Sequence, residues 1–337
     1  MSHRLLGTVV TFLALVVVPT ALSAGGGPSP GVLQGGDGVL GGGIRYVTVG
    51  DGRTSQLESI RAKGGQVLGW VNLPGGWGIP AVTFDGTTGG LARNGSTLVL
   101  GQTGYGTCTP RGCALLRSTS RFAIFTPKTL RRRATFALKG DFAFDALSPD
   151  GRRLYLIQHT SATNLNRYVV RAYDLGRGAL LPGAIADRTQ RGWVMQGSPV
   201  ARATTPNGRF VYTLYQNPGG YPFVHALDTV RGVAHCVGLP WTGDQSEIGT
   251  MKLTLADGGR TLAIAVPWTG SKAPSTLPSF AIDTRTYAVS QPQPGAPQGF
   301  PWWLLGVAAV PLLLGGALVA IRARRLSLPA RTAPSSG

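Results

Sequence analysis

One short pattern returns four times along the chain, and it constrains the fold more than any other feature of the sequence. Each copy is an apolar stretch, an Asn-Gly or Asp-Gly pair and a second apolar stretch. The four copies are Gly90–Gln102, Ala146–Gln158, Ala203–Gln216 and Leu253–Val266. Such a pair is the strongest short-range signal for a β-hairpin, because both central residues of the turn take positive φ. The turn glycines Gly95, Gly151, Gly208 and Gly258 are spaced 56, 57 and 50 residues apart, which predicts a repeated supersecondary unit.

A second hairpin pattern recurs out of phase with the first. Strand-like runs near residues 121–129, 167–178, 223–232 and 279–289 each contain a polar turn, and Asp174, Asp228 and Asp283 hold three of these turns. Aspartate suits such a turn because its carboxylate accepts backbone N–H groups two residues on. Ile44–Leu73 adds three more strand-like runs. Two hairpins per period predict four-stranded antiparallel blades, so we expect an all-β chain forming a β-propeller of about five blades. A pair of β-sandwiches is the alternative.

The segment Ser148–Tyr155, with the sequence Ser-Pro-Asp-Gly-Arg-Arg-Leu-Tyr, resembles the TolB-type and YVTN-type relatives of the WD-repeat family. Thr205–Arg209 is similar to a second, looser copy, and Tyr46–Val49 reads Tyr-Val-Thr-Val. The resemblance covers roughly residues 40 to 290, although no Trp-Asp dipeptide occurs. It implies a propeller. Because some YVTN-like propellers are lactonases, it also keeps a hydrolase as an alternative function.

The N-terminus reads as a signal peptide, residues 1–24. A small basic region with His3 and Arg4 precedes an apolar run, and small residues follow Pro19. A retained membrane helix is the alternative, but the apolar run is short for a hydrocarbon core of about 30 Å.

The C-terminus predicts a membrane anchor. Residues 302–321 carry no charge, and Arg322, Arg324 and Arg325 follow at once, which favours a cytoplasmic C-terminus. We therefore expect a single-pass type I protein of the cell membrane. Its parts are a signal peptide (1–24), a Gly/Pro-rich linker (25–40), an extracytoplasmic propeller (41–292), a linker (293–301), a transmembrane helix (302–321) and a cytoplasmic tail (322–337).

The charge of the chain restricts its partners. The sequence holds 32 Lys and Arg against 14 Asp and Glu, a formal net charge of +18. Such a field favours anionic neighbours, which outside a membrane means phospholipid headgroups, an anionic wall polymer or an acidic envelope protein, and not nucleic acid. The densest basic run, Lys128–Arg133, is a candidate docking patch or an ordinary solvated strand and turn.

The three cysteines favour one disulfide. Cys108 and Cys113 flank Thr-Pro-Arg-Gly, which suits a tight turn that brings the sulfurs together in an oxidising compartment. Cys236 is expected to be a buried, unpaired thiol. The cysteines and the four histidines lack metal-ligand spacing, so we expect no metal and no cofactor.

Two sets of residues are candidates for ligand binding on one propeller face. The tryptophans Trp77, Trp193, Trp241 and Trp268 fall in connections that open on that face, and Gln102, Gln158 and Gln216 end the second strand of three blades. Indole and amide groups suit a sugar or another polar ligand. The alternatives are indoles that fill gaps between blades and amides that cap the ladder ends.

The predicted function is a binding or scaffolding module at the cell envelope. The hydrolase alternative would need two carboxylates across a cleft, and the acidic residues outside the turns are Asp145, Asp187, Asp244 and Glu247. No catalytic residue is assigned.

Overall fold

The computed structural model describes residues 32–33, 37–103, 108–109, 112–113, 116–161, 167–190, 195–217, 219–241, 244–267 and 277–291. Apart from three short 3-10 turns, the regular structure in these ranges is β-strand, so the predicted all-β class is confirmed. The turns are η1 (Pro127–Thr129), η2 (Ser246–Thr250) and η3 (Asp257–Gly259).

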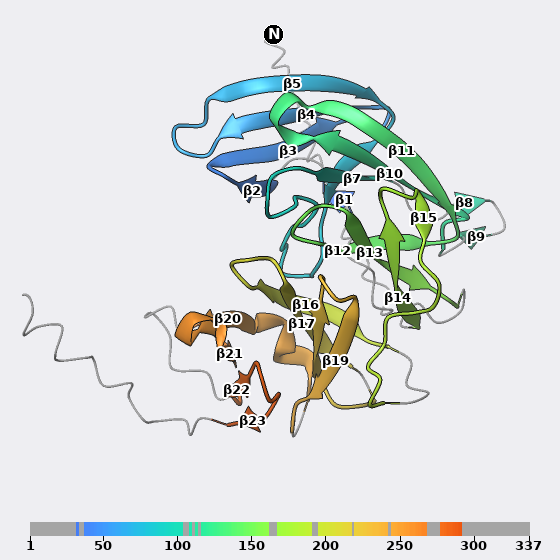
Figure 1. The fold of residues 1–337 in the computed structure, drawn as a ribbon. Helices are drawn as coiled ribbons and strands as arrows, with labels where there is room; N and C mark the ends of the chain where they lie inside the picture. Colours follow the sequence, from blue (N-terminus) through green and yellow to red (C-terminus); the bar gives the residue numbers. More distant parts are fainter. Residues whose placement is uncertain are drawn as a thin grey trace, which may run out of the picture.

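The strands form five antiparallel sheets, called here blades 1 to 5, each with its strands in chain order (Figure 1). Blade 1 contains β2 (Val39–Gly41), β3 (Ile44–Gly50), β4 (Thr54–Arg61) and β5 (Val67–Pro74). Blade 2 contains β1 (Val32–Leu33), β6 (Trp77–Pro80), β7 (Leu98–Gln102), β10 (Thr119–Thr126) and β11 (Arg131–Lys139). A small hairpin of β8 (Cys108–Thr109) and β9 (Gly112–Cys113) stands apart.

The three remaining blades have four strands each. Blade 3 contains β12 (Phe142–Leu147), β13 (Arg153–His159), β14 (Tyr168–Asp174) and β15 (Ala179–Leu180). Blade 4 contains β16 (Ser198–Thr204), β17 (Phe210–Gln216), β18 (Phe223–Asp228) and β19 (Val233–Gly238). Blade 5 contains β20 (Lys252–Ala256), β21 (Thr261–Ala265), β22 (Phe280–Asp283) and β23 (Val289–Ser290). The five repeated units predicted from the sequence are confirmed.

The predicted turns are built as their residues suggest. Gly95, Gly151, Gly208 and Gly258 all have positive φ, between 67° and 75°. The carboxylate of Asp228 accepts the backbone N–H groups of Val230 and Arg231, each at 3.0 Å. Asp174 and Asp283 accept the equivalent two amides in blades 3 and 5. The aspartate turns and the positive φ of the four glycines are therefore confirmed. Of the residues that precede these glycines only Asp257 has positive φ, so the other three turns are not the predicted two-residue turn with both central residues at positive φ.

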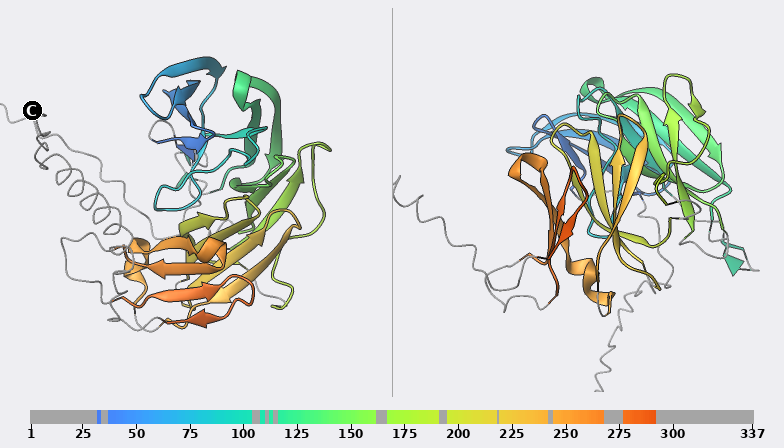
Figure 2. Two further views of the ribbon diagram at one scale, coloured as in Figure 1. Left: turned by 60° about the vertical axis from the view of Figure 1, so that its left-hand side comes forward. Right: turned by 60° about the horizontal axis from the view of Figure 1, so that its bottom comes forward.

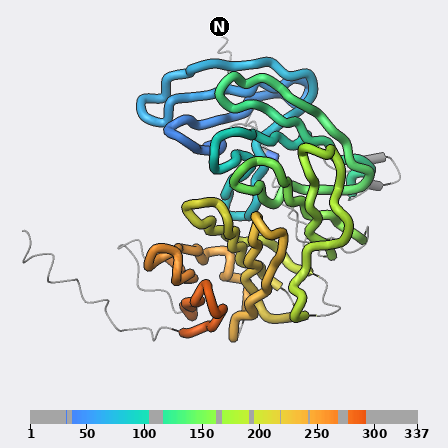
Figure 3. Tube along the Cα trace, in the orientation of Figure 1, coloured from blue at the N-terminus to red at the C-terminus, as the bar shows by residue number. Residues whose placement is uncertain are grey.

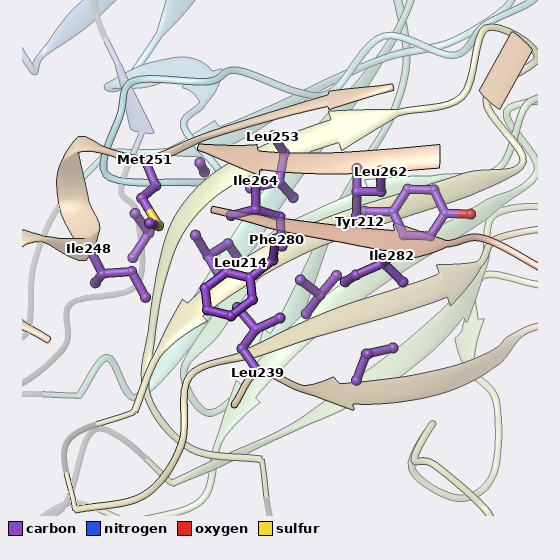
Figure 4. Packing of buried hydrophobic residues seen from close by; sticks show 14 of the residues in the cluster. Tyr212, Leu214, Leu239, Ile248, Met251, Leu253, Leu262, Ile264, Phe280 and Ile282 are labelled. Atoms are coloured by element: carbon purple, nitrogen blue, oxygen red, sulfur yellow. The ribbon is translucent and has the colours of Figure 1, made fainter. Parts of the chain in front are cut away.

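Each blade packs on the next through its own hydrophobic cluster. Alternate side chains of a strand point to opposite faces, so Tyr215 of blade 4 faces blade 3 while Leu214 faces blade 5. Figure 4 shows the cluster between blades 4 and 5, where Leu214 and Phe280 lie close together. The described residues contain four such clusters, one for each pair of consecutive blades.

The blades follow one another in an arc. Figure 3 traces the chain from blade 1 to blade 5 in order, and Figures 1 and 2 (left) place blade 1 and blade 5 at opposite ends of the row. None of the four clusters joins blade 5 to blade 1. In the part of the chain that the structure describes, the propeller-like arrangement is therefore open.

The connection between β6 and β7 corrects the predicted first hairpin. We expected Gly90–Gln102 to form it, but the first full strand of blade 2 is Trp77–Pro80, and residues 81–97 form a long connection, called here the axial connection. The predicted hairpin is present only in short form: Leu91 forms an isolated bridge with Leu98, and the amides of Ala92 and Val99 donate to the carbonyls of Thr97 and Gly90. The segment also makes contacts with other blades.

The axial connection touches every blade. The Thr88 hydroxyl donates to the Gly38 carbonyl beside blade 1 at 2.6 Å, and the Thr97 hydroxyl donates to the Gly151 carbonyl in blade 3 at 3.2 Å. In blade 4 the Pro199 and Val200 carbonyls accept backbone N–H groups of Phe84 and Asp85, and in blade 5 Lys252 donates to Asp85. The contacts with blades 4 and 5 tie blade 2 to blades that are not its neighbours in the chain.

The predicted signal peptide, transmembrane helix and cytoplasmic tail lie outside the described residues. Within the described residues, no helix is long and apolar enough to span a bilayer. The single-pass topology therefore stays a prediction.

Candidate functional site

The hairpins give the molecule two chemically different ends. The turn end carries the connections from first to second strand and from third to fourth strand, including the Asp-Gly and Asn-Gly turns. The glutamine end carries the remaining connections. Gln102 lies opposite Trp77 in the ladder, Gln158 opposite Phe142 and Gln216 opposite Ser198, so all three glutamines lie at the same end of their blades. The three glutamines therefore share one end of the blades, as the sequence predicted.

The two described tryptophans of the predicted binding face are buried. Trp77 is 6% exposed and its indole N–H donates to the Pro74 carbonyl at 2.9 Å. Trp241 is 5% exposed, packs on Phe280 and donates to the Asp244 carbonyl at 3.2 Å. Both indoles therefore fill space within the fold. Trp193 and Trp268 lie outside the described residues.

The glutamines are half-buried. The Gln158 side-chain carbonyl accepts from Arg171 at 3.0 Å, and the Gln216 amide donates to the Gln245 carbonyl at 3.1 Å. These bonds match the capping alternative. A ligand-binding role for the tryptophans and glutamines stays a prediction.

The turn end of blades 3 and 4 contains a cavity of about 740 Å³. Three turns form its walls: the Ser-Pro-Asp-Gly turn and the Asp174 turn of blade 3, and the Asp228 turn of blade 4. The lining residues are Ser148, Pro149, Asp150, Arg152, Arg153, Asp174, Gly176, Arg177, Thr229 and Val230. Three guanidinium groups and two carboxylates thus meet in one hollow.

The two carboxylates of the cavity are bound by the turns that carry them. Asp150 accepts from the Ser148 hydroxyl at 2.6 Å and from the Arg152 backbone N–H at 3.1 Å. Asp174 accepts the backbone N–H groups of Gly176 and Arg177, both at 2.9 Å. The Arg177 amide, together with that of Gly176, lowers the pKa of Asp174. Both carboxylates are therefore ionised at neutral pH and engaged locally.

The guanidinium groups are less engaged. In the described residues, the Arg152 guanidinium makes no hydrogen bond, and Arg177 makes only a 3.9 Å ion pair to Asp174 with its side chain 78% exposed. Arg153 donates to the Val230 carbonyl at 3.2 Å, which joins blade 3 to blade 4. Arginine forks match phosphate and carboxylate groups, so Arg152 and Arg177 can receive an anion.

More cations lie at the turn end of the blades. The Lys128–Arg133 run covers η1 and the start of β11, and its arginines are exposed. Arg209 forms a fork to Asp228, with distances of 3.0 and 2.7 Å from Nε and Nη2 to Oδ2. Whether the run is a docking patch stays a prediction, but it lies at the same end of the blades as the cavity.

A buried polar row crosses blade 4 and faces blade 3. Arg202, Thr213, His225 and Cys236 lie opposite one another on β16 to β19. Arg202 forms a buried ion pair with Asp145. Cys236 is free and buried, as predicted, and its sulfur lies 3.6 Å from His225 Nδ1.

This row does not form an activated nucleophile. Burial, together with the charge of Asp187, raises the pKa of the Cys236 thiol to about 12, and burial lowers the pKa of His225 to about 4. Both groups are neutral at pH 7, whereas a reactive cysteine needs its thiolate.

Among the other acidic residues, Asp145, Asp187 and Asp244 each have a partner close by. Asp187 pairs with His235 at 2.9 Å, and Asp244 accepts from Ser246 near η2. No group of three or more His, Cys, Asp or Glu in the described ranges is arranged to hold a metal ion.

Sequence reasoning missed the arginines of the cavity, although a signal was present. An arginine follows the turn glycine or turn aspartate in most repeats: Arg152, Arg177, Arg209, Arg231, Arg260 and Arg285. Because the turns share one end of the blades, this repetition concentrates positive charge there.

Comparison with known proteins assigns no family to the chain. No protein-family model matches the sequence, and no curated protein does. The solved structures that resemble the chain include the following three. The Dos1 propeller matches 74% of this chain at 10% identity with a TM-score of 0.41, and TolB from Acinetobacter baumannii matches 74% at 12% with a TM-score of 0.32. The β-propeller domain of Cps50 (Swd1) from Myceliophteria thermophila matches 79% at 10% with a TM-score of 0.42.

The chain spans 56% of the length of each of the first two structures and 71% of the third. At this identity and TM-score the likeness carries no conclusion about ligands or function.

Proposed function

We propose that this protein is a binding module of the cell envelope whose turn end binds an anionic wall polymer. One observation carries the proposal: the cavity between blades 3 and 4 presents Arg152 and Arg177 with little internal pairing, while Asp150 and Asp174 are held by their own turns. A phosphate-bearing chain would meet guanidinium groups there that make few hydrogen bonds within the protein, and the neighbouring arginines would extend the contact along the polymer.

The membrane anchor belongs to this proposal as well. The uncharged residues 302–321 followed by three arginines support a helix with a cytoplasmic C-terminus. A reporter that is active only in the cytoplasm, fused after Gly337, should work. Activity there of only an export-dependent reporter would reverse the topology.

Binding is tested with soluble poly(glycerol phosphate) and the full chain in detergent, by calorimetry at several salt concentrations. We expect the double variant Arg152→Gln/Arg177→Gln to bind at least about tenfold more weakly, because two charge-assisted contacts are lost. The matched control is Arg53→Gln/Arg188→Gln, which removes two exposed arginines outside the cavity. It should change the affinity less than twofold.

Equal weakening by both pairs would show that binding follows net charge and not this cavity. Absence of binding by the parent chain would end the proposal. No observation in the described residues favours the hydrolase alternative.

A further inference from the structure

In the described ranges, the arc leaves two blade faces without a neighbouring blade. Inside the arc, each interface packs a face of one blade on the opposite face of the next. The two faces left over are the one on blade 1 that points away from blade 2, and the one on blade 5 that points away from blade 4. They are called here the blade 1 outer face and the blade 5 outer face.

The blade 1 outer face is bulky and apolar. Leu57, Leu73 and Tyr46 point toward blade 2, so the alternate positions of the same strands point outward. Five of the eight large hydrophobic side chains that are exposed in the described residues belong to blade 1. They are Leu40 (64% exposed), Val49 (52%), Val67 (50%), Leu68 (43%) and Trp70 (60%).

The blade 5 outer face is flat. Leu253, Leu262, Ile264, Phe280 and Ile282 all point toward blade 4. The outward row opposite them runs across all four strands and contains only small side chains: Thr254, Ala263, Ala281 and Ser290. A flat face of small residues can receive a bulky one closely, which is what packing at interior density needs.

The charges of the two faces are also complementary. On blade 1, Arg45 lies on the outward side of β3, one residue past its start at the turn end. On blade 5, Asp283 ends β22 at the turn end and is exposed. Its Oδ1 accepts from Arg285 and Thr286 of its own turn, so Oδ2 is the oxygen that faces a partner's charge. A blade-on-blade stack with the turn ends aligned would bring these two opposite charges to the same edge of the interface.

Closure within one chain is opposed by the axial connection. Asp85 holds Lys252 of blade 5 at 2.8 Å, and Thr88 of the same connection holds Gly38 beside blade 1 at 2.6 Å. The connection thus fixes the two ends of the arc relative to each other, and Figure 2 (left) shows them apart. A second copy of the chain can supply the missing neighbour of each face.

A bilayer is a poorer partner for the blade 1 outer face. Glu58 lies directly opposite Trp70 in the ladder, and Gln56 donates to Asn72 at 3.1 Å on the same face. A carboxylate and two amides are costly in hydrocarbon, whereas protein interfaces combine aromatic anchors with such polar groups.

We propose that the blade 1 outer face of one copy packs on the blade 5 outer face of a second copy, which continues the blade-on-blade packing of the arc. The contact is heterologous, so each copy offers one face of each kind. It is independent of the anionic ligand.

The test measures the mass of the full chain in detergent by sedimentation over a wide range of concentrations. The parent should associate. Trp70→Asp blocks the blade 1 outer face and Ala281→Arg blocks the blade 5 outer face. Each variant alone should associate at least about 30-fold more weakly, as expected for an interface anchor. Tyr221→Asp, at a side chain that is 68% exposed in blade 4, is the control and should leave association unchanged.

A mixture of the two blocked variants separates this proposal from other modes. Trp70→Asp keeps a free blade 5 face and Ala281→Arg keeps a free blade 1 face, so the mixture should form pairs and nothing larger. Leu68→Asp and Ala263→Arg replace any variant that fails to fold.

Three outcomes would overturn the proposal. A parent that stays monomeric at every concentration excludes it, and flotation of that monomer with vesicles through Trp70 would assign the face to a bilayer. If Trp70→Asp weakens association and Ala281→Arg does not, the contact is a symmetric one between two blade 1 outer faces. Failure of the mixture to pair would exclude the heterologous contact.

Discussion

The Lys252 ammonium, in the first strand of blade 5, donates a hydrogen bond to the Asp85 carboxylate across 167 residues of chain, with 2.8 Å between Nζ and Oδ2. Asp85 also accepts from the hydroxyls of Thr83 and Thr87, at 2.6 and 2.7 Å. Its side chain is only 9% exposed. One carboxylate therefore organises the tip of the axial connection and joins it to the last blade.

Replacing Asp85 should destabilise the whole described fold. Asp85→Ala removes several charge-assisted hydrogen bonds, and we expect a loss of about 2 kcal/mol in the free energy of unfolding, measured by urea denaturation. Lys252→Met removes only the tie to blade 5 and should cost less. Equal stability of Asp85→Ala and the parent would show that the connection merely lies between the blades.

The Asp85 carboxylate also makes the stability of the fold depend on pH. Burial would raise the pKa of Asp85, but hydrogen bonds from Lys252, Thr83 and Thr87 lower it to about 2. Because the folded pKa lies below the unfolded value, its contribution to stability is present above about pH 4 and is lost as the pH falls toward 2.

Protonation of His225 should lower the stability of the fold at a higher pH than protonation of Asp85 does. Burial lowers its pKa to about 4, below the unfolded value of about 6.5. The unfolded chain therefore binds this proton first, and stability is full above about pH 6.5 and declines by up to about 3 kcal/mol as the pH approaches 4. In His225→Gln the decline between pH 6.5 and 4.5 should disappear. An unchanged decline in that variant would assign it to another group.

Gly95 and Gly151 allow a matched test of the turns, because their backbone conformations are alike and their surroundings differ. Their φ angles are 69° and 70°, so alanine at either position costs about 1 kcal/mol through the left-handed backbone. A Cβ at Gly95 meets nothing within 4 Å, whereas one at Gly151 overlaps Thr97 Oγ1 of the axial connection. We expect Gly151→Ala to destabilise by about 2 kcal/mol more than Gly95→Ala in thermal unfolding. Equal losses of stability in the two variants would mean that the contact between residue 151 and Thr97 relaxes freely.

The predicted disulfide can be tested by counting thiols. The backbone register places Cys108 opposite Cys113 across β8 and β9. No disulfide is found among the side chains that the structure describes, and those of Cys108 and Cys113 lie outside them. Protein that is produced with passage through an oxidising compartment and denatured without reductant should show one free thiol, that of Cys236. Three free thiols would exclude the disulfide.

The blades could be predicted because their signals are local. A positive φ at Gly151 and an aspartate turn at Asp228 are set by a few neighbouring residues, so the sequence alone marks both ends of a hairpin. The axial connection could not be predicted in this way. Its apolar residues look like a strand, but the groups that bind Phe84 and Asp85 belong to Pro199 and Val200, more than a hundred residues later.

The candidate site was only partly visible for the same reason. The sequence shows an arginine after each of several turns, but not that Arg152 and Arg177 face one cavity while Asp150 is held by its own turn. Nor does it distinguish an exposed indole from a buried one. Trp77 and Trp241 share their residue type with the exposed Trp70, and only the packing of the blades separates them.

The axial connection also determines how such a chain can lose its structure. Units that contact only their neighbours along the chain can unravel one at a time from either end. Here the hydrogen bonds of Asp85, Phe84 and Thr97 reach blades 3, 4 and 5, so fraying of the last blade breaks contacts made by the second. Denaturation should accordingly follow one cooperative transition. Renaturation should be slow, because the loop entropy of these remote contacts is lost before they form.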